Sequence, residues 1–326
     1  MRFFFRADAD SRIGTGHVMR CLALGQACVD AGHDVVFMTA CTNAAMLERL
    51  SAAGFEVRGA EELSKAPRAG DWLVFDGYHF DTACQERARE AGWRVLAIDD
   101  TAHLAHYAAD AILNQNITAE RCVYSHEPYT RLLLGPRFAL LRREFRRWRR
   151  CRGVPRVARK LLITLGGSDP QRVSLRVIEA VRHVGMDNLE AVVVAGTQYG
   201  AREELARAAH CAGVRVEANV QDMAPLMAWA DMAVSAAGST CWELAFLGVP
   251  SILIVVADNQ GEIAAGLAAQ GCAANLGPHD QVSVADIAAA IKALALDHGK
   301  RAGWSKRSAT LVDGMGAQRV TRFLET

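Results

Sequence analysis

The chain has 326 residues, of which 51% are hydrophobic and 22% charged, and its formal net charge is +1 at pH 7. This composition excludes an intrinsically disordered chain, and the near-zero charge argues against a protein that coats nucleic acid. The length leaves room for two domains of ordinary size.

Cysteine usage and apolar runs bound the class of protein further. Nine cysteines are scattered without a C-x-x-C pair, which is typical of reduced thiols and not of a disulfide framework or a zinc site. No apolar run approaches the ~20 residues of a membrane span, and the charge at Arg6 makes the N-terminus a poor signal peptide. We expect a cytoplasmic monomer with no metal, cofactor, nucleic-acid partner or membrane span.

The first half of the chain alternates strand and helix patterns. The aromatic stretch 2–6 predicts a buried strand, and further strands are expected at 34–39, 72–76, 94–98, 111–113 and 132–134. Helical spacing recurs at 17–31, 44–53 and 82–91, and a glycine follows each of these helices. This alternation predicts a parallel sheet covered on both faces.

A glycine-bearing loop joins the first strand to the first helix. Gly14 and Gly16 allow a tight turn and the close approach of a ligand, and His17 follows in the first turn of the helix. The helix N-terminus suits an anion and disfavours a charged imidazolium, so it favours the neutral ring that a general base needs. The alternative is that His17 only caps or packs the start of the helix.

A basic segment interrupts the alternation, with ten Arg or Lys among residues 142–160. We interpret it as the boundary between two domains, formed by a solvated helix and a linker. A nucleic-acid patch is the alternative, but aromatic residues are few in this segment.

A second alternating series follows the basic segment. Strands are expected at 160–165, 189–195, 214–217, 232–235 and 251–256, and helices at 171–184, 201–212, 223–230, 239–247 and 261–269, with a helical pattern after residue 282. The two series predict an α/β protein of two Rossmann-like domains, residues 1–145 and 158–326, whose parallel sheets face a shared cleft.

Three loops at strand ends of the second domain have the composition of a nucleotide-diphosphate site. The first is Gly238-Ser239-Thr240, where amides and hydroxyls can hold an anion, with Glu243 placed to accept from ribose hydroxyls. The second is Gly166-Gly167, and the third is Asp258-Asn259-Gln260. Taken singly, the first is also explained as a helix cap with a surface Glu, and the second as a capped helix start.

Two groups of segments carry a resemblance to a known family. Arg6-Ala7-Asp8-Ala9 with Gly14-Thr15-Gly16-His17-Val18-Met19-Arg20-Cys21, and Gly238-Ser239-Thr240-Cys241-Trp242-Glu243-Leu244-Ala245 with Asp258-Asn259-Gln260, resemble the PseG family. Those enzymes are UDP-sugar hydrolases of pseudaminic acid biosynthesis, the route to flagellin glycosylation. The resemblance runs from Met1 to about Gly271, and the wider MurG-like superfamily shares the Gly…Glu spacing but not the opening segment.

The resemblance implies a GT-B fold and a metal-independent, inverting hydrolysis of UDP-2,4-diacetamido-2,4,6-trideoxy-β-L-altropyranose to the free sugar and UDP. His17 matches the catalytic base that activates water for attack on the anomeric carbon. Tyr78 matches the sugar site, Glu243 the ribose contact, and Val220 a position beside the uracil ring. The remaining substrate-binding positions are Gly14, Gly16, Arg20, Gly166, Gly167, Gly238, Ser239, Thr240, Asn259 and Gln260.

The chain departs from the family pattern at two places. Ala237 stands where relatives often have glycine, so the turn there must tolerate a Cβ. Thr101-Ala102-His103 replaces a stretch that often carries arginine, and the preceding Asp99-Asp100 are either contacts to a substrate hydroxyl or amide, or solvated carboxylates. A MurG-like glycosyltransferase, a hydrolase of a related UDP-diacetamido sugar and a non-catalytic sugar-nucleotide-binding module are the alternatives.

Overall fold

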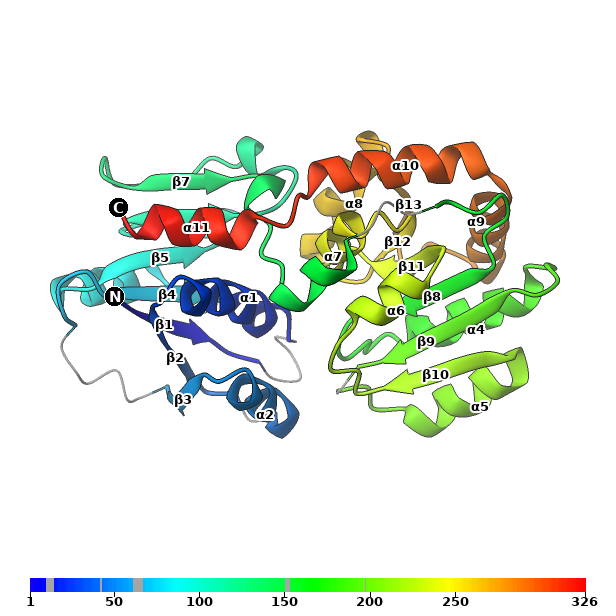
Figure 1. Ribbon diagram of the computed structural model, residues 1–326, viewed down its shortest axis with the longest axis horizontal. Coiled ribbons are helices and arrows are strands. Elements are labelled where there is room, and N and C mark those ends of the chain that lie inside the picture. Colours follow the sequence, from blue (N-terminus) through cyan, green and yellow to red (C-terminus); the bar gives the residue numbers. More distant parts are fainter. Residues whose placement is uncertain (10–14, 42, 61–66, 150–152, 197) are drawn as a thin grey trace. The chain divides into compact units, whose positions relative to one another are not determined.

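The computed structural model describes residues 1–9, 15–41, 43–60, 67–149, 153–196 and 198–326. The chain forms two compact units (Figure 1). Unit 1 comprises Met1–Arg143 and Gly314–Thr326, and unit 2 comprises Glu144–Asp313. Each unit is an α/β domain built on one parallel sheet.

The sheet of unit 1 has seven parallel strands in the order β3-β2-β1-β4-β5-β6-β7. Their bounds are β1 Arg2–Ala7, β2 Asp34–Thr39, β3 Glu56–Gly59, β4 Trp72–Asp76, β5 Arg94–Ile98, β6 Ala111–Asn114 and β7 Arg131–Leu134. The chain direction across the sheet reverses between β1 and β4, which makes this the switch point where such folds bind ligands.

Helices cover both faces of this sheet, and the three consecutive phenylalanines of β1 show why. Phe3 and Phe5 lie in a core with residues of α1 (Gly16–Asp30), α2 (Ala44–Ala52) and α11 (Gly316–Leu324), whereas Phe4 lies in a second core with α3 (Thr82–Glu90). Successive side chains of a strand point to opposite faces, so an unbroken apolar run serves a strand buried on both sides.

The C-terminal helix α11 returns to unit 1 and lies beside α1 (Figure 1). Trp72 Nε1 donates to the Leu324 carbonyl at 2.9 Å. A Cβ on Gly316 would stand 2.2 Å from the Ala139 carbonyl oxygen, so only glycine fits where α11 begins. The sequence-based boundary assigned residues 158–326 to the second domain, whereas residues 314–326 cluster with the first.

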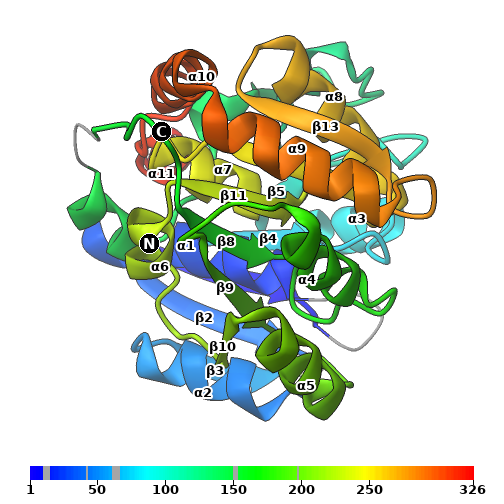
Figure 2. The same cartoon turned by 90° about the vertical axis from the view of Figure 1, so that its right-hand side faces the viewer.

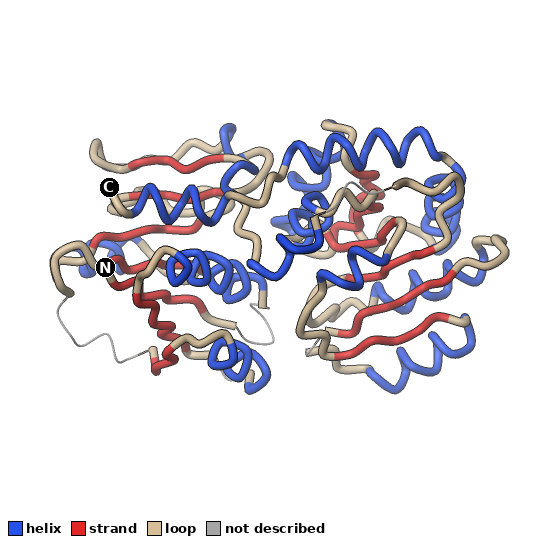
Figure 3. Tube along the Cα trace, in the orientation of Figure 1, coloured by secondary structure: helices blue, strands red, loops and turns tan. Residues whose placement is uncertain are grey.

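The sheet of unit 2 has six parallel strands in the order β10-β9-β8-β11-β12-β13. These are β8 Lys160–Thr164, β9 Glu190–Ala195, β10 Val214–Ala218, β11 Met232–Ala236, β12 Ser251–Val255 and β13 Ala273–Pro278. Strands and helices alternate along the chain here as in unit 1 (Figure 3). The switch point lies between β8 and β11.

Seven α-helices of unit 2 lie among the described residues. Helices α4 and α9 lie side by side and pack into the same core (Figure 2). The bounds are α4 Val173–His183, α5 Arg202–Ala212, α6 Ala224–Trp229, α7 Thr240–Phe246, α8 Gly261–Ala269, α9 Val284–Leu296 and α10 His298–Leu311, with the short 3₁₀ helix η4 at Asp258–Gln260.

The predicted parallel α/β architecture is confirmed, and two strands were missed. β3 and β13 are edge strands; β13 ends in Gly277-Pro278, and both residue types are depleted in strands. Gly32, Gly54 and Gly92 follow α1, α2 and α3 with φ of +84°, +85° and +94°, as the helix-stop prediction requires.

The structure describes the basic segment except for residues 150–152. It begins with the 3₁₀ helix η3 at Arg143–Trp148, where a solvated helix was expected. Further on, the buried Arg301 donates to the carbonyls of Pro155 and Arg156, at 2.6 and 3.1 Å, and so fixes the linker against α10. Among the described residues, no helix is long and apolar enough to cross a membrane.

Candidate functional site

The switch point of unit 1 gathers the polar residues that end its central strands. Ala7, the last residue of β1, pairs in register with Asp76, the last residue of β4. The loop after β1 leads into α1, whose first turn carries His17. Gly16 is the first residue of α1, and Gly14 lies outside the described residues.

His17 and Asp76 form a close pair. His17 Nδ1 lies 2.6 Å from Asp76 Oδ1, and the Asp76 side chain is fully buried while that of His17 is 13% exposed. The imidazole is therefore not turned into the core. It is held by a buried carboxylate and keeps part of its own surface exposed.

Arg20, one turn further along α1, completes the arrangement. Its guanidinium donates to Asp76 at 2.6 Å through both Nε and an Nη atom, and to Asp100 at 2.5 Å. Burial alone would raise the pKa of the Asp76 carboxyl, but the charge and hydrogen bonds of Arg20, together with the contact with His17, outweigh it and hold that pKa far below its usual range. Arg20 is thus an ion-pair partner of two carboxylates and only 6% of its side chain is exposed; its predicted contact with substrate stays a prediction.

These contacts fix the proton on the His17 ring. An ionised Asp76 can only accept, and its 2.6 Å contact with Nδ1 is much shorter than the 3.3 Å contact of Nδ1 with Arg20 Nη2, so Nδ1 carries the hydrogen and Nε2 is the acceptor, an assignment made from the hydrogen-bond network. A proton taken up at Nε2 creates an imidazolium whose charge Asp76 stabilises. This is the arrangement of a general base.

Tyr78, the residue that the resemblance matches to the sugar site, lies beside His17. The two rings meet edge to face, with centroids 5.4 Å apart, and Tyr78 is 41% exposed. The neighbouring His79 donates through Nε2 to Asp8 at 2.9 Å, and Asp8 also accepts from the Ala40 amide at 2.7 Å. Asp8 therefore links the loops that follow β1, β2 and β4.

Asp99 and Asp100 have different hydrogen-bond partners. Asp99 accepts from the amides of Thr101 and Ala102, at 2.8 and 3.1 Å, and from the Tyr107 hydroxyl, so its oxygens are occupied by its own loop. Asp100 accepts from Arg20, and its Oδ1 is buried without a hydrogen-bond partner among the described residues.

The switch point of unit 2 gathers the predicted glycine loops. Gly166 has φ of +93°, a conformation that favours glycine. A Cβ on Gly196 would lie 2.1 Å from the Gly167 oxygen, so the loops after β8 and β9 are in contact. Gly238 differs, because an added Cβ would meet only the Gln260 side chain at 3.8 Å and the backbone does not require glycine.

The turn between β11 and α7 presents the groups expected of a diphosphate loop. Its backbone hydrogen bonds begin at Cys241 and Trp242, which donate to Gly238 and Ser239, so the Ser239 and Thr240 amides precede them. The departure at Ala237 is accommodated, because this residue is fully buried and has no positive φ.

The other predicted contacts of unit 2 occupy neighbouring strand ends. Glu243 is partly buried in the first turn of α7, and Asn259 is exposed in η4 after β12. Gln260 accepts from the Val256 amide at 3.0 Å and reaches Gly238. Val220 is partly buried in the loop after β10.

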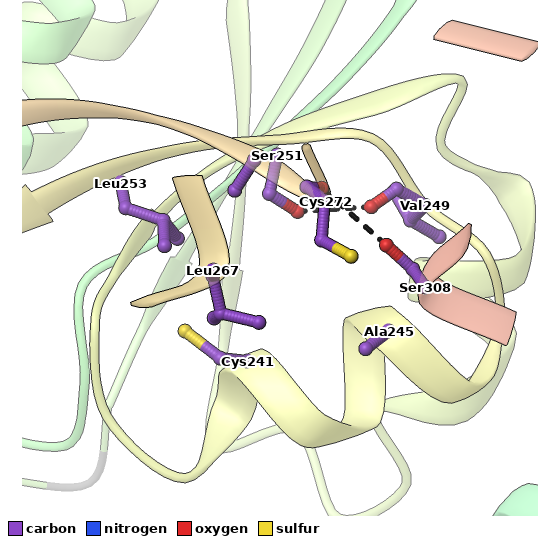
Figure 4. A pocket seen from close by; sticks show the side chains of 9 residues that line it. Cys241, Ala245, Val249, Ser251, Leu253, Leu267, Cys272 and Ser308 are labelled. Atoms are coloured by element: carbon purple, nitrogen blue, oxygen red, sulfur yellow. Dashed lines mark hydrogen bonds between the residues drawn. The ribbon is translucent and has the colours of Figure 1, made fainter. Parts of the chain in front are cut away.

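A small cavity elsewhere in unit 2 is not a substrate site. It lies among α7, α8, α10 and strands β12 and β13, and its lining includes Cys241, Cys272 and Ser308 (Figure 4). Its volume of about 10 Å³ is that of one water molecule. A nucleotide does not fit.

In the parts of the chain that the structure describes, no three His, Cys, Asp or Glu side chains gather closely enough to hold a metal ion. None of the eight cysteines described there forms a disulfide.

Asp76 is the candidate functional residue that sequence reasoning missed. It is 59 residues from His17, and their contact depends on the pairing of β1 with β4. The available signal was an apolar strand, Trp72–Asp76, that ends in a carboxylate at the edge where parallel α/β sheets bind ligands.

Two Rossmann-like domains with parallel sheets, each with polar loops at its switch point, define the fold class as GT-B. Solved structures agree: MurG of Acinetobacter baumannii has a TM-score of 0.65 and 15% identity, with 99% of each chain covered. The spinosyn rhamnosyltransferase SpnG, complexed with thymidine diphosphate, has a TM-score of 0.60 and 15% identity over 100% of each chain.

Sequence comparisons point to the same superfamily. Residues 161–318 match the glycosyltransferase family 28 C-terminal domain. The spore coat polysaccharide biosynthesis protein SpsG of Bacillus subtilis is 28% identical over 67% of this chain and 65% of its own length. An uncharacterized protein of Methanocaldococcus jannaschii is 23% identical over 80% of this chain and 57% of its own.

A third relative has a name that states its enzymatic reaction. The UDP-N-acetylglucosamine–N-acetylmuramyl-(pentapeptide) pyrophosphoryl-undecaprenol N-acetylglucosamine transferase of Xanthomonas oryzae is 30% identical over 52% of this chain and 40% of its own length. The chain thus spans about three fifths of the length of the first two relatives and less of this one.

Proposed function

We propose that this protein is a UDP-sugar hydrolase of the PseG type, acting on UDP-2,4-diacetamido-2,4,6-trideoxy-β-L-altropyranose. The observation that carries the proposal is the imidazole of His17, fixed by Asp76 at 2.6 Å with Nε2 as its acceptor. Water is a poor nucleophile unless a base removes its proton in the transition state, and this ring is arranged for that task.

The proposed mechanism has one displacement. His17 Nε2 takes a proton from water, the water oxygen bonds to the anomeric carbon, and the C1–O bond to UDP breaks with inversion. The electron pair of that bond leaves with UDP. Asp76 stabilises the imidazolium that forms, and Tyr78 lies against the sugar.

Unit 2 is proposed to hold the nucleotide. The amides and hydroxyls of Ser239 and Thr240 bind the diphosphate and stabilise the charge that develops on it. Glu243 accepts from the ribose hydroxyls, Val220 lies beside uracil, and Asn259 contacts the phosphates or the sugar. The family 28 match over residues 161–318 supports a UDP-binding role for this unit.

A MurG-like glycosyltransferase is the second candidate. The observation that favours it is the similarity of part of this chain to proteins named as N-acetylglucosamine transferases. Such an enzyme would move the sugar to an acceptor hydroxyl, and the same His17 would deprotonate that hydroxyl.

The test is UDP release from candidate UDP-diacetamido sugars with no acceptor present. We expect steady turnover by the wild type and a loss of about 10²–10⁴-fold in kcat for His17→Ala. His210→Ala, which changes an exposed histidine of α5, is the matched control. Turnover that appears only after an acceptor is added favours the transferase, and full activity of His17→Ala refutes the base assignment.

A further inference from the structure

A second oriented histidine lies beside Tyr78, and the proposed displacement does not use it. The rings of Tyr78 and His103 meet edge to face with centroids 5.3 Å apart, as those of Tyr78 and His17 do at 5.4 Å. The exposed tyrosine thus stands between two imidazoles. His103 follows β5, two strands from β1 in the sheet.

Asp99 orients His103 much as Asp76 orients His17. His103 Nδ1 lies 2.7 Å from Asp99 Oδ2, and the Asp99 side chain is 2% exposed while that of His103 is 25% exposed. Other donors already point at both Asp99 oxygens, so this carboxyl acts as an acceptor. His103 Nδ1 therefore carries the hydrogen, and Nε2 is the acceptor of an accessible ring.

We propose that His103 is a substrate-contacting, specificity-determining residue, whose Nε2 accepts a hydrogen bond from an N–H or O–H donor of the sugar that lies against Tyr78. This inference rests on the proposed function, since it assumes a sugar beside His17. Binding sites fix orientation with a few well-placed polar groups around apolar or aromatic surface. A ring already held by a buried carboxylate loses little conformational freedom when it binds.

The competing explanation is that His103 only supports its loop through Asp99. Two substitutions separate these roles, because each keeps one end of the imidazole. In His103→Asn the amide nitrogen stands near Nδ1 and can still donate to Asp99, but no atom replaces Nε2. In His103→Gln the amide reaches the position of Nε2, and the donor to Asp99 is lost. Asp99 retains its backbone donors and Tyr107 in both variants.

The experiment compares the kinetics of UDP release from the UDP-2,4-diacetamido sugar. We expect His103→Asn to raise KM by about ten-fold, with kcat changed by less than about three-fold, and His103→Gln to stay within about three-fold of the wild type in both. The inhibition constant of UDP should be unchanged in both variants, because UDP is held by unit 2. A raised KM confined to His103→Gln, or a wild-type KM in both variants, overturns the proposal.

Binding measurements keep the two proposals distinguishable if the wild type releases no UDP. Calorimetric titration with the same UDP-sugar then tests whether His103 contacts the sugar, with UDP alone as the reference. Weaker binding of the UDP-sugar by His103→Asn only, with UDP binding unchanged, supports the His103 contact although hydrolysis has failed. Equal binding by wild type and His103→Asn, or no binding of the sugar beyond that of UDP, refutes it.

Discussion

At the scale of single residues, one device recurs in unit 1: an aspartate orients a histidine. Asp76 holds His17 at 2.6 Å, and Asp99 holds His103 at 2.7 Å. In each pair the carboxylate receives Nδ1–H, so Nε2 is left as the acceptor. Only Asp76 is also paired with a buried arginine, Arg20. That extra charge keeps the carboxylate ionised and available to stabilise a protonated His17.

Replacing Asp76 by Asn tests this device. The amide of Asp76→Asn can offer its N–H to the ring, which favours the tautomer with the hydrogen on Nε2, where it cannot accept a proton. We expect kcat for UDP release to fall by about 10²–10⁴-fold, with a smaller effect on KM. Steady-state kinetics check this, and a variant with wild-type kcat would show that Asp76 does not control the tautomer.

The same carboxylate makes stability depend on pH. Its pKa is lowered in the folded chain, so its stabilising effect is complete above the unfolded pKa of about 4 and is lost as the pH falls through the lower, folded value. At neutral pH we expect Asp76→Asn to lower the free energy of unfolding by about 3 kcal/mol, because the buried Arg20 loses one of its two carboxylate partners. Urea unfolding at several pH values should show this difference shrinking in acid. A difference that is constant with pH would contradict the assignment.

At the scale of elements, the loops at the switch points contain two kinds of glycine. Gly166 and Gly196 are required by backbone conformation or by close packing. Gly238 is required by neither, since a Cβ there would meet only the end of Gln260. Open space beside the Ser239 and Thr240 amides is what a diphosphate needs.

Gly238→Ala should therefore separate binding from folding. We expect UDP affinity, measured by calorimetry, to fall about ten-fold or more as the new methyl group crowds the phosphates. The melting temperature should not fall, because alanine suits this backbone. Gly299→Ala in α10, whose Cβ would meet only Asp297 at 3.7 Å, is the control. Unchanged UDP affinity would show that the diphosphate does not bind at this turn.

The start of α11 gives the opposite prediction. A Cβ at Gly316 would lie 2.2 Å from the Ala139 oxygen, so backbone must move to admit it. We expect Gly316→Ala to lower the free energy of unfolding by about 1–3 kcal/mol, whereas Gly299→Ala changes it little or raises it. Denaturant unfolding of both variants tests this. Equal stability would mean that α11 does not dock as described.

At the scale of the whole molecule, the chain builds unit 1, then unit 2, and returns to unit 1 with its last helix. Sequence patterns predicted most of the strands of both sheets, because buried parallel strands are apolar runs between glycine-ended helices. They identified β2 and β4 with the bounds observed, Asp34–Thr39 and Trp72–Asp76.

What the patterns did not predict depends on contacts between distant segments. The helical pattern after residue 282 includes α11, Gly316–Leu324, but does not indicate the unit on which this helix packs. His17 was found from its own loop, whereas its partner Asp76 becomes recognisable only once β1 and β4 are paired. The ion pairs of Arg20 were not predicted for the same reason, because its two carboxylate partners are 56 and 80 residues away.

The most direct test of the central claim is to run the reaction in water enriched in ¹⁸O and to locate the label by mass spectrometry. Attack of a His17-activated water on the anomeric carbon places the heavy oxygen in the released sugar and none in UDP. His17→Ala should form almost no labelled sugar in the same time. Label found in UDP would mean that water attacks phosphorus, and would contradict the account.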